Sequence, residues 1–199
     1  MACEHSALEV LNANKVAAAR SSIIDAAGRR FLEVARFDRS GLHGRLTMVT
    51  LSGLDGALGM LDQKWAKVAA HLYMHGQISA DDKSRLELLD LFGYLIGNTD
   101  RHHGNVAFSW DQNQQFKLLP IYDMLPMFYR PNQHGEVVEN RWSATNVDPA
   151  LVRHLPVALA LARQFWDRVA KDESISDDFK LIAANHVDAL NGLNVPTLE

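Results

Sequence analysis

The chain has 199 residues, 47% of them hydrophobic and 22% charged, so it can bury one good core and is long enough for one domain with a small appendage. Its 20 basic and 24 acidic residues give a formal net charge of −4, which provides no broad electrostatic attraction for nucleic acid or an anionic membrane. The single cysteine, Cys3, excludes an intrachain disulfide, and no apolar run approaches the roughly 20 residues needed to span a bilayer.

The first predicted elements are a helix and a β-hairpin. Apolar side chains recur at helical spacing over residues 4–12. Residues 22–25 and 30–34 are two segments of strand-forming residues joined at a glycine-containing turn, which predicts a pair of strands. Residues 53–59 contain three glycines but neither the spacing nor the lysine of a phosphate-binding loop, so we interpret them as a connector.

Two helices are predicted in the middle of the chain. Residues 61–73 carry apolar side chains at helical spacing, and Ser79 is a candidate N-cap for a second helix that extends to Ile96. The second helix leads directly into a polar loop, residues 97–105, with the sequence Gly-Asn-Thr-Asp-Arg-His-His-Gly-Asn.

A β-hairpin is predicted after this loop. Val106, Phe108 and Trp110 alternate with other residues, which places them on one face of a strand. Residues 116–119 supply a second strand after the polar turn 111–114. Such a hairpin would bring the residue before it, an asparagine, close to the aspartate that comes after it in the sequence Pro-Ile-Tyr-Asp.

Three polar residues in these two loops are the minimum set for phosphoryl transfer. In ATP-dependent kinases one carboxylate receives or orients the acceptor hydroxyl, and an amide oxygen and a second carboxylate hold Mg²⁺ against the phosphates. Asp100, Asn105 and Asp123 supply these groups in that order. We therefore predict Asp100 as the catalytic residue and Asn105 and Asp123 as the metal ligands.

The same loop has simpler interpretations. Two adjacent histidines beside an aspartate also occur in ordinary surface loops and in metal sites, but a zinc site would be expected to have helical i, i+4 ligands or a cysteine framework, and this loop has neither. We expect His102 to brace the loop through hydrogen bonds and His103 to face solvent. Arg101 is expected either to be exposed or to pair with a carboxylate.

The C-terminal part is predicted to be helical after a polar stretch. Residues 129–136 form either a substrate-facing loop or an ordinary surface loop. Asp148 and Pro149 are typical of an N-cap followed by proline at the first helical position, and Pro156 is expected to interrupt the helix that they begin. Residues 176–178 are predicted to begin the last helix.

The motifs around the predicted site resemble one known family. Asp-Arg-His-x-x-Asn at 100–105, with a later hydrophobic-Tyr-Asp, resembles the catalytic and metal-binding loops of the HipA-like serine/threonine kinases, the toxins of bacterial toxin–antitoxin pairs. The first motif is shared with phosphatidylinositol kinases, whereas Leu-Pro-Ile-Tyr-Asp-Met-Leu-Pro at 119–126 favours the HipA-like family. Residues 34–39, Val-Ala-Arg-Phe-Asp-Arg, are similar to the family's adenine-binding hinge, although Ala35 stands where the family commonly has Glu. The resemblance implies that Arg36 and Phe37 bind the nucleotide cofactor.

The resemblance also implies a fold and a function. The expected fold is α+β and mostly α-helical, a protein-kinase-like C-terminal lobe with small β-hairpins and with the N-lobe largely missing. Residues 1–39 would be a remnant of the N-lobe, and residues 40–199 the C-terminal kinase lobe. The implied activity is transfer of a phosphoryl group from ATP, with Mg²⁺, to a serine or threonine hydroxyl of a protein substrate. Family members are held by a DNA-binding antitoxin.

Several alternatives stay open. No phosphate-covering loop or strand lysine precedes the first helix, and Glu4 is only a weak counterpart of the helix glutamate that pairs with such a lysine. The chain is therefore a fragment, a lobe completed by a separate N-lobe subunit, or a non-catalytic pseudokinase that serves as an interaction module. A lipid or small-molecule kinase is a further rival. The N-terminus lacks the features of a secretory signal, so we expect a cytoplasmic protein without direct nucleic-acid or membrane binding.

Overall fold

The computed structural model describes residues 1–60, 63–110, 115–131, 134 and 147–193. The helices are α1 Ala2–Ala13, α2 Leu51–Leu58, α3 Trp65–Met74, α4 Ala80–Leu95, α5 Leu155–Lys171 and α6 Asp177–Asn191, with short 3₁₀ helices η1 His103–Asn105, η2 Met127–Tyr129 and η3 Pro149–His154. The strands are β1 Ser21–Ala26, β2 Arg29–Val34, β3 Arg39–Ser40, β4 Gly44–Arg45, β5 Val49–Thr50, β6 Ala107–Trp110 and β7 Phe116–Leu118. The expectation of a mostly helical α+β fold with small hairpins is confirmed.

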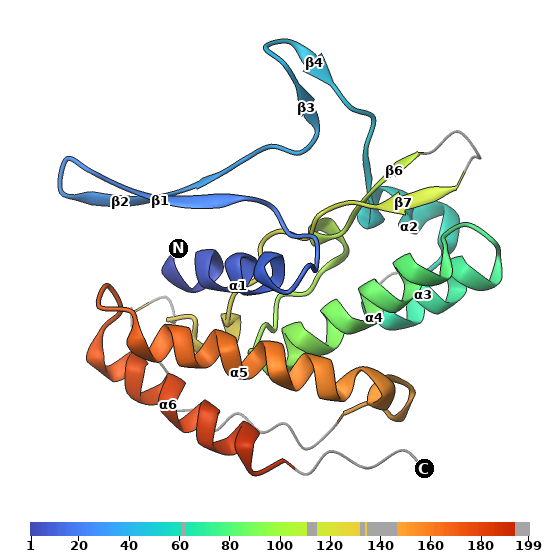
Figure 1. Cartoon of the computed structure of the whole chain (residues 1–199). Coiled ribbons are helices and arrows are strands. Elements are labelled where there is room, and N and C mark those ends of the chain that lie inside the picture. Colours follow the sequence, from blue (N-terminus) through green and yellow to red (C-terminus); the bar gives the residue numbers. More distant parts are fainter. Residues whose placement is uncertain (61–62, 111–114, 132–133, 135–146, 194–199) are drawn as a thin grey trace.

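Helix α5 is the centre of the helical part. It packs against α1, α4 and α6, while α3 covers α4 on the side away from α6 (Figure 1). Phe165 on α5 is fully buried and contacts Phe92 on α4 edge-on, with ring centroids 6.4 Å apart. Because full burial of one such side chain contributes about 1.5–3 kcal/mol, this contact fixes the helix that leads into the predicted catalytic loop.

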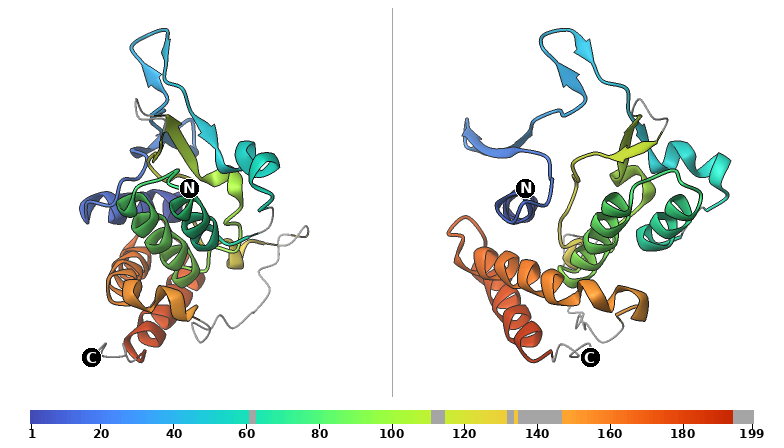
Figure 2. Two further views of the ribbon diagram at one scale, coloured as in Figure 1. Left: turned by 90° about the vertical axis from the view of Figure 1, so that its right-hand side faces the viewer. Right: turned by 45° about the vertical axis from the view of Figure 1, so that its right-hand side comes forward.

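Two of the three small sheets lie outside this core. Strands β1 and β2 pair antiparallel in the register Ser21 with Val34, which confirms the predicted hairpin. The β3–β4 hairpin projects from the rest of the molecule, as both views of Figure 2 show, and Leu42 near its tip is 95% exposed.

The third sheet, β5-β6-β7, adjoins the predicted site. Strands β6 and β7 pair antiparallel, with Phe108 opposite Leu118, so the predicted hairpin is confirmed; its turn, residues 111–114, lies outside the described residues. Val106 and Phe108 are fully buried, but Trp110 at the strand end is 57% exposed. The predicted apolar face is therefore buried only in its first part.

The prediction that residues 53–59 form a connector is wrong, because α2 occupies this segment. The Thr50 hydroxyl accepts a hydrogen bond from the Gly53 amide at 3.2 Å and caps the helix N-terminus. Gly59 ends the helix in the left-handed conformation, with φ 62°, which costs glycine no steric strain. These two caps outweigh the low helix propensity of the internal glycines.

The remaining helix ends agree with the predicted capping in most respects. Ser79 accepts a hydrogen bond from the Asp82 amide at 3.0 Å and begins α4. Asp148 caps a 3₁₀ helix, η3, rather than an α-helix. Pro156 does not interrupt a helix; it lies in the first turn of α5, where its missing N–H is not needed. Of the predicted loop 129–136, only residues 129–131 and 134 are described.

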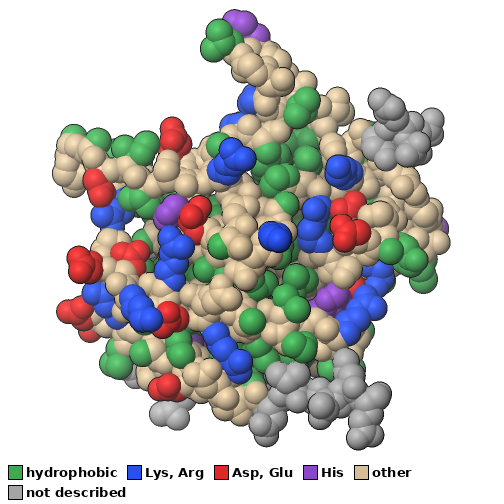
Figure 3. Space-filling model, in the orientation of Figure 1, with side chains coloured by type: hydrophobic (Ala, Val, Ile, Leu, Met, Phe, Trp, Pro, Cys, Tyr) green, Lys and Arg blue, Asp and Glu red, His purple; other side chains and the backbone are tan. Residues whose placement is uncertain are grey.

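The surface has mixed charge. Figure 3 shows acidic and basic side chains interspersed on one face, in keeping with the small net charge. Within the described ranges, no helix combines the length and the apolar character that a membrane span requires. The thiol of Cys3 on α1 is half-buried, and burial raises its pKa to about 11.

A buried histidine lies between α5 and α6. The His186 ring stacks on Trp166, with centroids 4.0 Å apart and planes 6° from parallel, and it is hydrogen-bonded to the Tyr129 hydroxyl. Burial lowers the pKa of His186 to about 4 and raises the pKa of Tyr129 to about 12. The neutral imidazole is therefore the form that the fold accommodates.

The low pKa of His186 predicts that the folded protein loses stability in acid. Below the ordinary histidine pKa of about 6.5 the unfolded chain takes up a proton that the folded chain does not bind, so the stability linked to His186 is complete above that pH and falls towards pH 4. Between about pH 6.5 and pH 4 the free energy of unfolding should fall by an amount of the order of 3 kcal/mol. Urea unfolding of wild type and His186→Phe between pH 7 and 4.5 should show a flatter pH dependence in the variant. Equal slopes for both proteins would contradict the prediction.

Candidate active site

The predicted catalytic loop begins at a tight helix end. Gly97 has φ 72°, and the Asn98 amide donates to the Gly93 carbonyl at 2.8 Å, which closes the last turn of α4. The side chain of Asn98 is buried, and its Oδ1 accepts a hydrogen bond from the Asp100 amide at 3.0 Å. The backbone at Asp100 is thus tied to the helix end.

Asp100 and Asn105 occupy the two ends of this loop. Asp100 is exposed, whereas Asn105 is buried and donates through Nδ2 to the Asp100 carbonyl at 3.2 Å. The Oδ1 atom of Asn105 accepts no hydrogen bond from any residue in the described part of the chain. This amide oxygen is therefore available as a neutral metal ligand.

Asp123 lies on the neighbouring loop in an unusual conformation. Its φ is 56°, in the left-handed region that residues with a side chain rarely adopt and that often marks functional sites. The preceding Tyr122 hydroxyl donates to the Gly104 carbonyl at 2.6 Å, which joins the two loops. Ile121 forms a parallel bridge with Ala18, so the segment after α1 supports the same loop.

Glu4 on α1 faces Asp123. Burial raises the pKa of the Glu4 carboxyl, and the nearby charge of Asp123 raises it further. Asn105 and Asp123 carry only oxygen atoms as possible metal ligands, and such ligands suit Mg²⁺. The described residues contain no cluster of three His, Cys, Asp or Glu that could enclose a metal alone, and Mg²⁺ usually takes its remaining ligands from phosphates and water.

The two residues predicted to bind nucleotide lie just after β2. Arg36 forms a two-pronged ion pair with Asp38, with both N–O distances 2.6 Å. The Phe37 ring is half-buried against Tyr122, with centroids 5.7 Å apart. The fold therefore brings Phe37 to the Asp123 loop and turns the Arg36 side chain towards Asp38.

A buried carboxylate holds the loop from the side of α4. Asp90 accepts from Arg101 Nε at 3.0 Å and from the Ala66 amide at 3.1 Å, so it pairs with the loop and caps α3. Arg101 also donates to the Asn98 carbonyl. Gly93 makes room for this arginine, because an added Cβ would lie 2.5 Å from its Cδ. Of the two expectations for Arg101, pairing with a carboxylate is confirmed.

A second buried pair holds the loop from the side of α2. His103 Nδ1 lies 2.6 Å from Asp55 Oδ1, and His103 Nε2 lies 2.8 Å from the Gln63 carbonyl. Both ring nitrogens of His103 are therefore within hydrogen-bond distance of an oxygen, so the ring connects α2 to the segment before α3. The prediction that His103 faces solvent is wrong, because the side chain is only 7% exposed.

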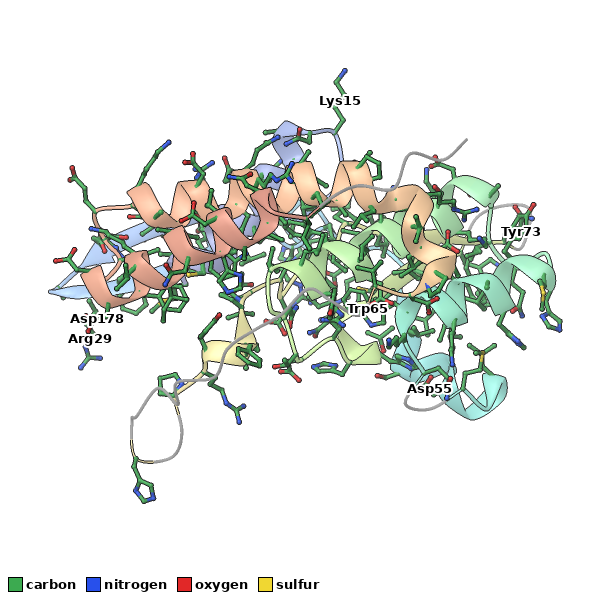
Figure 4. All side chains as sticks on the ribbon, turned by 90° about the horizontal axis from the view of Figure 1, so that it is seen from below. Lys15, Arg29, Asp55, Trp65, Tyr73 and Asp178 are labelled. Carbon is green, nitrogen blue, oxygen red and sulfur yellow. The ribbon has the colours of Figure 1, made fainter. Side chains whose placement is uncertain are left out.

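His102 and Trp65 also hold the predicted catalytic loop in place. His102 Nδ1 accepts from the Gly104 amide at 3.0 Å, which confirms that His102 braces the loop. Trp65 is fully buried at the start of α3 and donates through Nε1 to the His102 carbonyl at 3.3 Å. Figure 4 labels Trp65 and Asp55, the anchors that α3 and α2 contribute.

Three of these supporting residues, Asp55, Asp90 and Trp65, were not predicted from the sequence. Asp90 carried a usable signal, since a carboxylate within the apolar half of an amphipathic helix requires a partner. Asp55 was hidden in the segment interpreted as a connector. Trp65 was recognised only as part of an apolar stripe.

Comparison with known proteins identifies relatives. Residues 1–188 match the HipA-like C-terminal domain family. The chain is 32% identical over 185 residues to Toxin YjjJ of Escherichia coli (strain K12), an alignment that covers 90% of this chain and 41% of YjjJ. The chain thus spans less than half the length of this relative.

Two solved structures have a similar fold. One is a chain of the HipA, HipB and operator DNA complex from Shewanella oneidensis MR-1, with a TM-score of 0.64 and 13% identity over 95% of this chain and 54% of that chain. The other is the Helicobacter pylori proinflammatory kinase CtkA, with a TM-score of 0.61 and 13% identity over 95% of this chain and 82% of that chain. Because the sequence identity is only 13%, these two structures establish the fold alone. This fold is the one expected from the sequence.

The double role of Asp90 predicts a large effect on stability. Asp90→Ala leaves Arg101 without its partner beside the core and removes the cap of α3, so the free energy of unfolding should fall by about 3 kcal/mol. The matched control Asp167→Ala removes an exposed pair with Lys171 and should cost no more than about 0.5 kcal/mol. Chemical denaturation of both variants tests this difference; equal losses would show that Asp90 is not a structural anchor.

Proposed function

Because this chain belongs to the HipA-like C-terminal domain family, we propose that it provides the catalytic lobe of a Mg²⁺- and ATP-dependent protein kinase. The reaction is transfer of the γ-phosphoryl group to a serine or threonine hydroxyl. One observation carries the proposal: the loop with Asp100 and Asn105 is joined by the Tyr122–Gly104 hydrogen bond to a neighbouring loop in which Asp123 has a strained backbone.

Each of the three residues has one role in this proposal. The exposed Asp100 accepts the proton of the acceptor hydroxyl or orients that hydroxyl towards the phosphate. Asn105 and Asp123 hold Mg²⁺, one through a neutral oxygen and the other through an anionic oxygen. When bound, the ion neutralises charge on the phosphates.

The nucleotide's adenine is proposed to lie at residues 34–39. Phe37 packs on Tyr122, so a base held at this segment would lie beside the loop that carries Asp123. Contacts to adenine at such a hinge run largely through backbone groups. We propose that Arg36 and Phe37 contribute their backbone here, because the Arg36 guanidinium is engaged by Asp38.

We also propose that additional N-lobe elements complete the active enzyme. In this arrangement residues 1–39 are the part of the chain that belongs to the N-lobe, and residues 40–199 form the C-terminal lobe. The greater length of YjjJ and of the Shewanella chain supports the idea. That structure also contains HipB and operator DNA, which supports a DNA-binding antitoxin as a partner and a cytoplasmic location.

The metal assignment predicts weaker nucleotide binding in an Asp123 variant. Asp123→Asn keeps a side chain that tolerates the left-handed backbone but removes the charge. Its affinity for Mg·ATP should fall about tenfold or more, as on loss of a metal-binding interaction. Calorimetry with and without Mg²⁺ measures this, with the exposed Asp178→Asn as a control. Metal-independent binding that the Asp123 substitution leaves unchanged would refute the assignment.

The role of Asp100 predicts a defect in transfer rather than in binding. In the active assembly, Asp100→Asn should lower the rate of phosphoryl transfer about 100-fold or more and leave ATP affinity nearly unchanged, because the group acts mainly in the transition state. Radiolabel transfer to a protein substrate provides the measurement. A full rate in this variant would show that another group is the base, and no transfer by any assembly would favour a non-catalytic module.

A further inference from the structure

A pocket of about 470 Å³ opens beside the predicted catalytic loop. Its lining includes Thr99, Asp100 and His102 of the loop, Ser52 at the start of α2 and Lys64 just before α3. Neither Asn105 nor Asp123 lines it. The pocket therefore includes Asp100 but neither of the proposed metal ligands.

Most of the charged groups in this pocket already satisfy one another. Asp55 pairs with His103, and Asp90 pairs with Arg101, in both cases with little exposure of the carboxylate. Asp100 and Lys64 differ, since both are exposed and neither forms an ion pair with a described residue. One carboxylate and one ammonium group thus remain available to a ligand.

The backbone at Lys64 is fixed relative to Asp100. The preceding Gln63 carbonyl binds His103 Nε2 at 2.8 Å, and the following Trp65 indole donates to the His102 carbonyl at 3.3 Å. Lys64 therefore lies between two attachments to the catalytic loop itself. Its own carbonyl accepts from the first turn of α3. Its side chain makes no capping hydrogen bond, so it has no evident role in folding.

We infer that this pocket binds the acceptor segment of a protein substrate and that Lys64 selects an acidic side chain near the acceptor hydroxyl. The inference rests on the proposed kinase function, and it adds a substrate class: serine- or threonine-containing segments with a neighbouring Asp or Glu. Asp100 meets the hydroxyl, and Lys64 meets the carboxylate. Since Lys64 does not touch the reacting atoms, it determines specificity rather than catalysis.

The test uses two labelled serine peptides that differ only in acidic or basic residues around the serine. Their binding to the complete protein is measured by fluorescence anisotropy without nucleotide, and their phosphorylation is measured separately with Mg·ATP. Wild type should prefer the acidic peptide about fivefold, the size expected for one exposed ion pair. Lys64→Met should remove the preference, and Lys64→Glu should reverse it. Lys67→Met, an exposed lysine on α3 outside the pocket, should retain it.

The outcomes separate this inference from the proposed function. A preference that does not depend on residue 64, or no binding of either peptide, overturns the inference. A rate that falls equally for both peptides in Lys64→Met, with binding selectivity unchanged, places Lys64 at the nucleotide and also overturns it. Selective binding that depends on residue 64 supports the inference even if no phosphate is transferred, in which case only the kinase proposal fails.

Discussion

An exposed carboxylate such as Asp100 keeps a fixed position only if buried groups hold the backbone on both sides of it. Here the loop is held from α4 by Asp90, from α2 by Asp55, and from α3 by Trp65. Each of these three helices thus contributes one buried contact to the loop. The order of the loop is therefore a property of the packed helices, since the short 3₁₀ turn η1 could not provide it alone.

The choice of charged anchors has a physical reason. Buried ion pairs add little net stability compared with well-packed apolar side chains, because removing charges from water is costly. They are directional, however, and each can bind several groups at fixed angles. Asp90 joins a loop guanidinium to a helix amide, and His103 joins α2 to the carbonyl of Gln63. Apolar contacts would hold the same elements together without fixing the loop's register.

The sequence predicts those parts of the fold and site that depend on residues close together in the chain. The capping serine of α4, the β1–β2 and β6–β7 hairpins and the polar residues of the two loops could all be recognised from spacing and residue type. The contact between His103 and Asp55 could not be recognised in this way, because 48 positions separate the two residues and only folding brings them together. The sequence does not predict helix α2, because its internal glycines weigh against a helix more strongly than its two caps favour one. The roles of Asp100, Asn105, Asp123, Arg36 and Phe37 stay predictions.

The half-buried thiol of Cys3 has a practical consequence. With a pKa of about 11, almost none of it is thiolate at neutral pH, and the thiolate is the reactive species. We therefore expect Cys3 to react more slowly with maleimides at neutral pH than an exposed cysteine would. A cysteine placed at Leu42, on the projecting β3–β4 hairpin, would be labelled with a fluorophore in preference to Cys3. Distances between this hairpin and a labelled partner could then be measured in the chain that retains Cys3.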